Sequence, residues 1–176
     1  RQLEDLASTD ELTGLYNRRY ALPHMARIAE RSAISGRPFA AMVLDLDHFK
    51  HINDTYGHST GDEVLKQISD RLRSNLRSVD LVCRMGGEEF LVVMPDTEMT
   101  EARAAAERLR RVTADMPFQM PDGTRQIPVT LSIGVTMGGP ISYKDGSVQA
   151  VVDSADRALM GSKMQGRNQV TFGQTA

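Results

Sequence analysis

The sequence predicts an α/β sandwich, in which helices flank a mainly antiparallel central sheet. Three observations lead to this fold class. The 176 residues, 40% of them apolar, can bury one substantial core but are too few for two ordinary domains. Segments with strand and helix patterns alternate in the approximate order βα(α)ββαβα(β), without a repeat or a linker. Two short β-prone segments around a Gly-Gly turn also indicate an antiparallel hairpin.

The first part of the chain predicts a connector, a helix and a buried strand. Residues 1–7 have the pattern of the end of a connector helix, so the domain itself is expected over 8–176. Residues 17–35 have helical periodicity, and Pro23 marks either an early turn or the true start of this helix. The nearly continuous apolar run 39–46 is typical of a central strand that is covered on both faces.

The same periodicities predict the remaining elements. They are a helix over 62–76, short strands over 81–84 and 90–94, a helix over 100–114, a strand over 129–136, a long helix over 148–160 and an edge strand over 169–172. Residues 161–166 are expected to fray or turn. Because glycine accepts positive φ, Gly86 and Gly87 predict the hairpin turn, which places Glu88 and Glu89 at its tip.

Charge and composition exclude several classes of protein. The net charge of −2 is spread along the chain, so neither a nucleic-acid-binding tract nor a polybasic membrane anchor is expected. No apolar run approaches the roughly 20 residues that a membrane helix requires. Cys83 is the only cysteine, which excludes an internal disulfide and favours a reducing compartment, by default the cytoplasm. The chain does not begin with Met, so we expect a regulatory domain upstream.

Acidic residues lie where the central strand ends. Asp45 and Asp47 project to the same side of a strand, while Leu46 points the other way and leaves its carbonyl available. Oxygen ligands of this kind suit Mg²⁺. If the tip with Glu88 and Glu89 lies beside this strand end, the two segments form a site for polymerase-like phosphoryl chemistry. Taken alone, each segment favours a simpler interpretation, as solvated strand-end caps or an ordinary exposed hairpin.

The residues that follow suggest binding of a phosphate and a base. Residues 47–50 can wrap a phosphate with successive backbone N–H groups near the start of the next helix. A polar turn is expected over 53–62, where Asn53 and Asp62 could pair with a guanine edge. The alternative is simple turn chemistry, because Asn, Asp and Gly are turn residues in any case. Spacing alone does not decide between the two.

Four sequence blocks occur in order along the chain: DELTGLYNRR over 10–19, DLDHFKHINDTYGH over 45–58 with Gly61 and Asp62, RMGGEEF over 84–90, and Ala155-Asp156 with KMQGRN over 163–168. Together, these blocks resemble the GGDEF family of diguanylate cyclases over residues 10–172. The tip is Gly-Gly-Glu-Glu-Phe instead of Gly-Gly-Asp-Glu-Phe, a variant that active members also use. The resemblance implies a fold like that of nucleotidyl cyclases and polymerase palms, with this motif on a β-hairpin.

The resemblance also implies a Mg²⁺ site, which Mn²⁺ could fill, and a GTP site. Glu88 is the family's proposed proton acceptor. The implied metal ligands are Asp45, the Leu46 carbonyl, Glu88 and an assisting Glu89. The implied GTP contacts are Asn53 and Asp62 to guanine with His58 in the same pocket, Phe49 and Lys50 as backbone donors to the β- and γ-phosphates, Gly86 and Gly87 for close backbone approach, and the cations Lys163 and Arg167.

In the implied reaction, two GTP molecules form cyclic di-GMP and two pyrophosphates leave. One domain can hold only half of this reaction, so two domains would face each other in a homodimer. Arg77-Ser78-Val79-Asp80 also resembles the RxxD motif at which the product inhibits the family, with Arg108 as a secondary contact. The simpler interpretation is an exposed helix-to-strand turn and one arginine on a solvated face.

Two other functions stay open at this point. A sensor module could bind GTP or cyclic di-GMP without turnover, although such modules usually have a damaged tip and this tip keeps both acids. Another two-metal nucleotidyl-transfer or cyclase reaction could use the same acids, because they do not dictate the acceptor hydroxyl.

Overall fold

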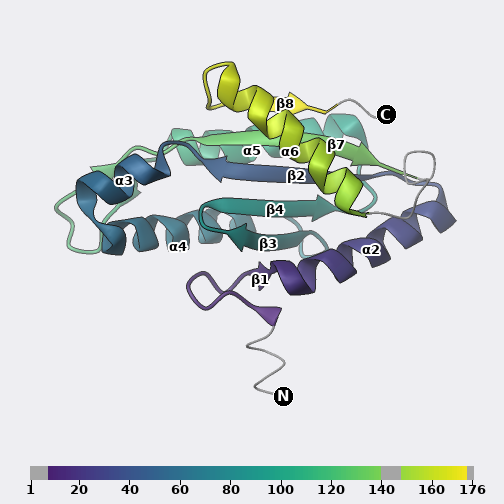
Figure 1. The fold of residues 1–176 in the computed structure, drawn as a ribbon, viewed down its shortest axis with the longest axis horizontal. Helices are drawn as coiled ribbons and strands as arrows, with labels where there is room; N and C mark the ends of the chain where they lie inside the picture. The colour runs from purple at the N-terminus through teal and green to yellow at the C-terminus, as the bar shows by residue number, and fades with distance from the viewer. Residues whose placement is uncertain (1–7, 140–147, 174–176) are drawn as a thin grey trace.

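A six-stranded sheet forms the centre of the computed structural model, which describes residues 8–139 and 148–173 (Figure 1). The four inner strands are antiparallel, and a parallel strand is added at each edge. The predicted, mainly antiparallel sandwich is therefore confirmed, while the connector helix expected over 1–7 lies outside the described residues. In spatial order the strands are β1 (Tyr16–Asn17), β3 (Leu81–Gly86), β4 (Glu89–Met94), β2 (Phe39–Leu46), β7 (Leu131–Gly138) and β8 (Val170–Phe172).

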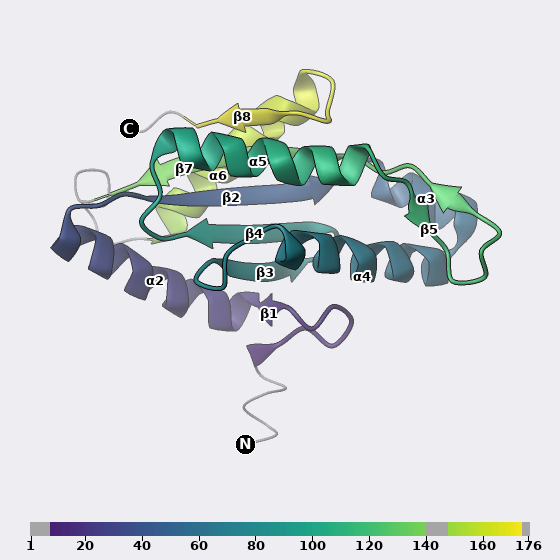
Figure 2. The ribbon, with the colours of Figure 1, turned by 180° about the vertical axis from the view of Figure 1, so that it is seen from behind.

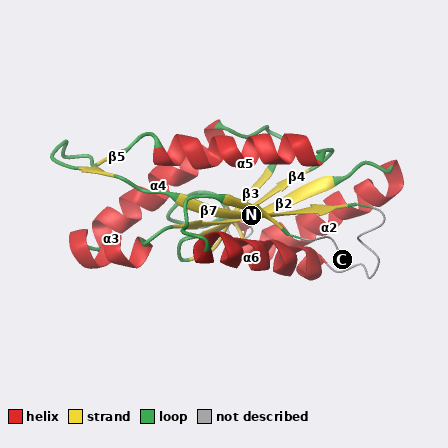
Figure 3. Cartoon of the chain, turned by 90° about the horizontal axis from the view of Figure 1, so that it is seen from above, coloured by secondary structure: helices red, strands yellow, loops and turns green. Residues whose placement is uncertain are grey.

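Helices cover both faces of the sheet, as Figure 2 and Figure 3 show. The pair α4 and α5 packs on one face, and the pair α2 and α6 packs on the other. Alternate side chains of β2 enter these two cores, so the strand is buried along its whole length, as predicted. The helices are α2 (Arg18–Ser35), α3 (Phe49–Tyr56), α4 (His58–Ser74), α5 (Met99–Ala114) and α6 (Val148–Met164).

The predicted role of Pro23 is wrong. Helix α2 begins at Arg18, because Asn17 caps it by accepting a hydrogen bond from the Tyr20 N–H at 3.0 Å. Pro23 lies inside this helix. A proline leaves the carbonyl four residues earlier without its helical partner, here that of Arg19. Both residues are exposed, so water can solvate that carbonyl.

The polar turn predicted over 53–62 is also wrong. These residues belong to α3 and α4, which are separated only by Gly57 with a φ of 93°. Most of the polar side chains lie on the exposed sides of the two helices. The composition of such a short solvated helix resembles that of a loop, which explains the error.

Three further features differ from the prediction or add to it. Helix α6 continues to Met164, which brings Lys163 onto the helix. Strand β1 and a small ribbon of β5 (Phe118–Gln119) and β6 (Gln126–Ile127) were not predicted, because two-residue strands are too short to show periodicity.

Within the two described ranges, no helix has both the length and the apolar character needed to cross a membrane.

Candidate active site

Asp47, at the end of β2, connects three segments of the chain. Its buried carboxylate accepts hydrogen bonds from the hydroxyls of Thr130 and Ser132, both at 2.6 Å, and from the Asn168 backbone N–H at 3.0 Å. Thr130 directly precedes β7, Ser132 lies in β7, and Asn168 follows α6. Asp47 therefore holds the strand end to the segment after α6, and its oxygens are already occupied by protein donors.

Asp45 lies on the same face of the sheet but has a different environment. Its carboxylate forms an ion pair with Lys163 of α6. The hairpin lies beside it, because the register of β2 and β4 sets Glu89 opposite Asp45. In addition, the Leu46 N–H donates to the Glu88 carbonyl at 3.3 Å. The structure thus brings the hairpin tip to the acidic strand end, as predicted.

The backbone of the tip requires its two glycines. Gly86 has a φ of 153° and Gly87 a φ of 52°, in the region that favours glycine. Neither would place a Cβ within 4 Å of another atom, so conformation and not crowding selects glycine here. The Arg84 Nε donates to the Gly87 carbonyl at 2.9 Å, while its Nη1 pairs with Asp10 at 3.1 Å. These contacts hold the turn from outside the site.

A cavity of about 280 Å³ lies between the strand end, the start of α3 and the end of α6. It contains most of the predicted metal and phosphate ligands, although these come from three separate parts of the sequence. Glu89 lies next to the cavity, because it is opposite Asp45 in the register of β2 and β4. The lining residues are Asp45, Leu46, Asp47, His48, Phe49, Lys50, His51, Glu88, Lys163 and Arg167.

Carboxylates are clustered around Asp45 and Glu89 at this cavity. Burial raises the pKa of Asp45, although the Lys163 ammonium opposes the rise. The pKa of Glu89 is raised to about 7, mainly by burial, then by repulsion from and hydrogen bonding with Asp156, and also by repulsion from Asp45. Glu88 adds a further acid that raises the pKa of Asp45. The ammonium of Lys163 therefore interacts with more than one carboxylate.

These residues fit a divalent metal ion by their chemistry. The available donors are carboxylate oxygens and the Leu46 carbonyl, which are the ligands that hard divalent cations prefer. The ammonium of Lys163 on Asp45 shows that a cation is favourable at this point. Across the described residues, no three acidic, His or Cys side chains are yet gathered closely enough to hold a metal. A bound cation would therefore have to draw Asp45 and Glu88 together.

Asp156 of α6 belongs to this cluster, although the sequence motifs assigned it no role. Its carboxylate raises the pKa of Glu89 by repulsion and by accepting a hydrogen bond from the protonated form of that residue. Residues 156 and 163 are about two helical turns apart, so Asp156 and Lys163 lie on the same face of the helix. This spacing is the sequence signal that could have identified Asp156.

The start of α3 offers backbone donors to an anion. His48 is the N-cap of this helix, has a φ of 57° and makes no side-chain capping hydrogen bond. The first N–H groups of α3 therefore receive no acceptor from the cap. Phe49 and Lys50 line the cavity here, and Lys163 and Arg167 line it as well. The predicted phosphate-binding groups thus share one cavity.

The predicted base-reading residues do not line this cavity. Asn53 follows Phe49 by one turn of α3, and its Oδ1 is buried without a hydrogen-bond partner among the described residues. His58 and Asp62 lie at the start of α4, and both are exposed. The structure therefore separates the three base-reading residues from the acids, with Phe49 between them.

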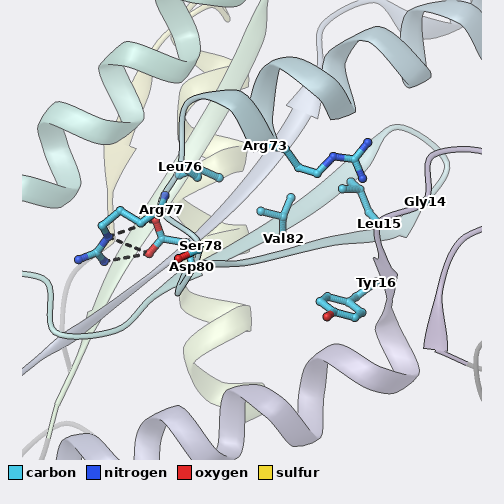
Figure 4. Close-up of a pocket in the computed structure, with 9 residues that line it drawn as sticks. All are labelled: Gly14, Leu15, Tyr16, Arg73, Leu76, Arg77, Ser78, Asp80 and Val82. Carbon is cyan, nitrogen blue, oxygen red and sulfur yellow. Dashed lines mark hydrogen bonds and ion pairs between the residues drawn. The ribbon is translucent and has the colours of Figure 1, made fainter.

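Arg77 and Asp80 of the predicted inhibitory motif lie at the turn between α4 and β3, where they line a cavity of about 490 Å³ (Figure 4). The Arg77 guanidinium donates to Asp80 at 2.8 Å, and the Arg77 backbone N–H donates to the same carboxylate at 2.7 Å. The guanidinium also donates to the Pro95 carbonyl and the Thr97 hydroxyl, both at 2.9 Å. Arg77 and Asp80 therefore satisfy one another in this structure.

Arg108 lies on α5 and approaches the same turn. Its guanidinium donates to the Asn75 carbonyl at 3.0 Å, two positions before Arg77. The side chain is exposed, so its other donors can reach solvent or a ligand. The structure thus places all three predicted inhibitory residues around the end of α4.

Comparison with known proteins identifies the family. The profile described as "Diguanylate cyclase, GGDEF domain" matches residues 7–169. The chain belongs to this family. The GGDEF family also includes proteins that share much of this sequence: the response regulator PleD of Caulobacter vibrioides is 43% identical over 166 residues. That match covers 94% of this chain but only 36% of PleD, so the chain spans about a third of that relative.

Solved GGDEF domains have the same fold. The GGDEF domain of DgcB from Caulobacter crescentus, in complex with c-di-GMP, superimposes with a TM-score of 0.87 at 31% identity. The match covers 94% of this chain and 93% of that one. The active GGEEF domain of a diguanylate cyclase from Vibrio cholerae gives a TM-score of 0.80 at 29% identity, covering 91% and 98% of the two chains. The family and fold inferred from the sequence are therefore confirmed.

Proposed function

We propose that this chain is a diguanylate cyclase, with a GGDEF domain over 8–176 that condenses two GTP molecules into cyclic di-GMP. The observation that carries the proposal is the shared cavity, in which Asp45, Leu46 and Glu88 lie beside Lys163 and Arg167. Acids for a metal and cations for phosphates thus meet in one place. The similarity to an active GGEEF domain supports turnover instead of mere binding. The GTP substrate and the buried Cys83 agree with the cytoplasm as the compartment.

The metal in this proposal is a divalent cation, Mg²⁺ or alternatively Mn²⁺. Asp45, the Leu46 carbonyl and Glu88 would hold it, with assistance from Glu89. The ion supplies charge neutralisation on the phosphates when bound. Lys163 would then leave Asp45, and its ammonium would become available to the phosphates together with Arg167.

The protein's own groups bind and orient GTP. Backbone N–H groups of Phe49 and Lys50 donate to the β- and γ-phosphates at the start of α3. Gly86 and Gly87 leave open space next to the tip, so the nucleotide can approach the backbone. Glu88 accepts the proton from the attacking 3′-hydroxyl.

Guanine binds between α3 and α4 in this proposal. The unpartnered Asn53 Oδ1 accepts from the donor edge of the base, and the Asp62 carboxylate accepts from the same edge. His58 lines the entrance of this pocket at the first residue of α4. The distance along α3 from Asn53 to Phe49 then sets the distance between base and triphosphate.

The stoichiometry of the reaction requires two copies of the chain. Each 3′-hydroxyl attacks the α-phosphate of the other GTP, two P–O bonds form, and a pyrophosphate leaves from each nucleotide. The residues above provide one set of nucleotide contacts per chain. Two domains therefore face one another as a homodimer, and a regulatory domain upstream of residue 8 controls their pairing.

The product inhibits the enzyme at the second cavity in this proposal. Arg77, Asp80 and Arg108 would bind cyclic di-GMP, with the arginines on its phosphates or bases and the carboxylate on a guanine edge. Binding would open the present pairing of Arg77 with Asp80. The relative DgcB was solved with c-di-GMP, which supports the assignment of this ligand.

A turnover assay with GTP and Mg²⁺ tests the proposal. Glu88→Ala should lower the rate of cyclic di-GMP formation by about 10²–10⁴-fold, because it removes the proton acceptor and a metal ligand. Glu30→Ala, on the exposed side of α2, is the matched control and should retain the parent rate. A parent protein that binds GTP but forms no cyclic di-GMP would overturn the proposed activity.

A further inference from the structure

Gly61 of α4 lies against Asn53 of α3 with no room for a side chain. A Cβ built on Gly61 would lie 1.9 Å from the Asn53 Oδ1 and 3.0 Å from its Cγ. It would also lie 3.2 Å from Cζ of Phe49. Contacts under 3.0 Å do not persist in proteins, so an alanine at this position would displace the Asn53 carboxamide.

Backbone conformation does not explain a glycine at this position. Gly61 is buried inside a regular helix and does not have the positive φ of Gly57 or Gly86. Glycine inside a helix lowers stability relative to alanine. A residue that is unfavourable for its own helix is therefore explained here by the close approach of Asn53.

The atom that requires this space is the one that has no partner. Asn53 Oδ1 is buried and accepts no hydrogen bond from the described residues. A buried acceptor without a donor is costly, so it indicates a ligand that supplies the donor. Guanine presents the N1–H and the N2 amino group along one edge, whereas adenine has no donor at the equivalent positions. The position of Oδ1 thus bears directly on the choice of base.

We infer that Gly61 is a positioning residue for base selection: the absence of its side chain holds the Asn53 Oδ1 in the orientation that accepts from guanine. This inference rests on the proposed binding of GTP between α3 and α4. It adds a residue that touches no substrate and acts only through Asn53.

In Gly61→Ala, the new Cβ would clash with the Asn53 Oδ1, and this contact determines the expected effect on GTP binding. The Asn53 carboxamide is the end of a flexible side chain, so it can rotate away and leave the fold intact. Phe49 needs to shift by only a few tenths of an ångström. The variant should therefore fold, keep its triphosphate contacts and lose one hydrogen bond to guanine.

The experiment measures KM for GTP and the inhibition constant of ATP, which competes through its triphosphate. In Gly61→Ala, KM for GTP should rise about tenfold, the value for one lost hydrogen bond to a buried group. The inhibition constant of ATP should stay within about twofold, because adenine donates nothing to Oδ1. Gly161→Ala is the control, since it changes a helical glycine whose Cβ would meet only Cγ2 of Thr171 at 3.6 Å.

A double variant separates positioning from general packing. Asn53→Ala should raise KM for GTP, and adding Gly61→Ala to it should cause no further rise, because the atom that clashed is gone. An equal rise of KM in both backgrounds, or an equal loss of ATP and GTP binding, would overturn the inference. An unchanged KM in Gly61→Ala would also overturn it, while an inactive parent protein would instead refute the proposed cyclase function.

Discussion

Two ion pairs join predicted ligand-binding residues in this molecule, and they differ in the number of additional hydrogen bonds that stabilise them. Lys163 reaches Asp45 from α6 and forms no other hydrogen bond with the described residues, in a cavity where further carboxylates compete for its ammonium. Arg77 and Asp80 belong to one turn, and the pair is reinforced by the Arg77 N–H, the Pro95 carbonyl and the Thr97 hydroxyl. The Asp80 side chain is 0% exposed.

This difference has a physical meaning for the two proposed sites. A cation and triphosphate can replace the Lys163–Asp45 pair at little cost, because the acids gain a better counter-ion and the lysine gains phosphates. A ligand at the second site must compensate for several hydrogen bonds of Arg77. We therefore expect the ion pair of the proposed catalytic site to be replaced by ligands more readily than the hydrogen bonds of Arg77 at the proposed inhibitory site.

The strongest test of the comparison removes the acid of the weaker pair. Asp45→Asn should lower the rate of cyclic di-GMP formation by at least about 10²-fold, because the metal loses a charged ligand. The assay is GTP turnover at saturating Mg²⁺. Asp70→Asn is the control, since Asp70 forms an exposed pair with Arg73 and should not affect the rate. A rate for Asp45→Asn close to that of the control would refute the proposed role of Asp45.

A smaller effect is expected at the firmer pair. Arg77→Ala should raise the inhibition constant of cyclic di-GMP about tenfold, because the product loses one charge-assisted hydrogen-bonding group. Inhibition is measured relative to the uninhibited rate of each variant. Arg111→Ala removes an exposed arginine from α5 and should leave the inhibition constant unchanged. Equal inhibition of both variants would show that this turn is only structural.

The smallest effect concerns the cluster of acids beside the proposed catalytic cavity. Folding raises the pKa of Glu89 from 4.5 to about 7, so ionising it costs stability as pH rises through this range. In metal-free protein, the Tm should therefore fall between pH 5 and pH 8. Asp156→Asn removes the neighbouring charge that raises the pKa of Glu89 most, so it should reduce this fall of the Tm by about 1–3 °C.

Asp153→Asn provides the matched control for this measurement. Asp153 lies on the same helix, is exposed and bonds with Gln149, so its replacement should leave the pH dependence of the Tm as in the parent. The same fall in the Tm of Asp156→Asn and of the parent would contradict the assigned cause of the Glu89 shift.

Sequence periodicity was sufficient for the parts of the fold with continuous patterns. The apolar run of β2 and the spacing of Val64, Ile68 and Leu72 in α4 correspond to buried faces in the structure. The strand and hairpin patterns predicted the positions of the acids in these two elements, and the family resemblance predicted that they form one site. Short helices such as α3 could not be predicted, because solvated polar residues occur in both helices and turns.

Pairings between distant residues could not be predicted from the sequence. Asp45 and Asp47 have the same residue type and direction, yet one pairs with Lys163 and the other accepts from Ser132. Only the packed structure places these partners, which are 118 and 85 positions away. For the same reason, neither the link of Asp156 to Glu89 nor the contact of Gly61 with Asn53 was visible in the motifs.

The pairing of β2 with β4 also limits where the chain can change in length. Because side chains alternate along a strand, inserting or deleting one residue in β4 would turn Glu89 from the α6 face into the opposite core. Such a change would disable the site while keeping every acid in the sequence. Length variation should instead be tolerated in the exposed 121–125 connection between β5 and β6. A search for more distant family members could therefore accept sequences that differ in length at this connection and reject those that differ in length within β4.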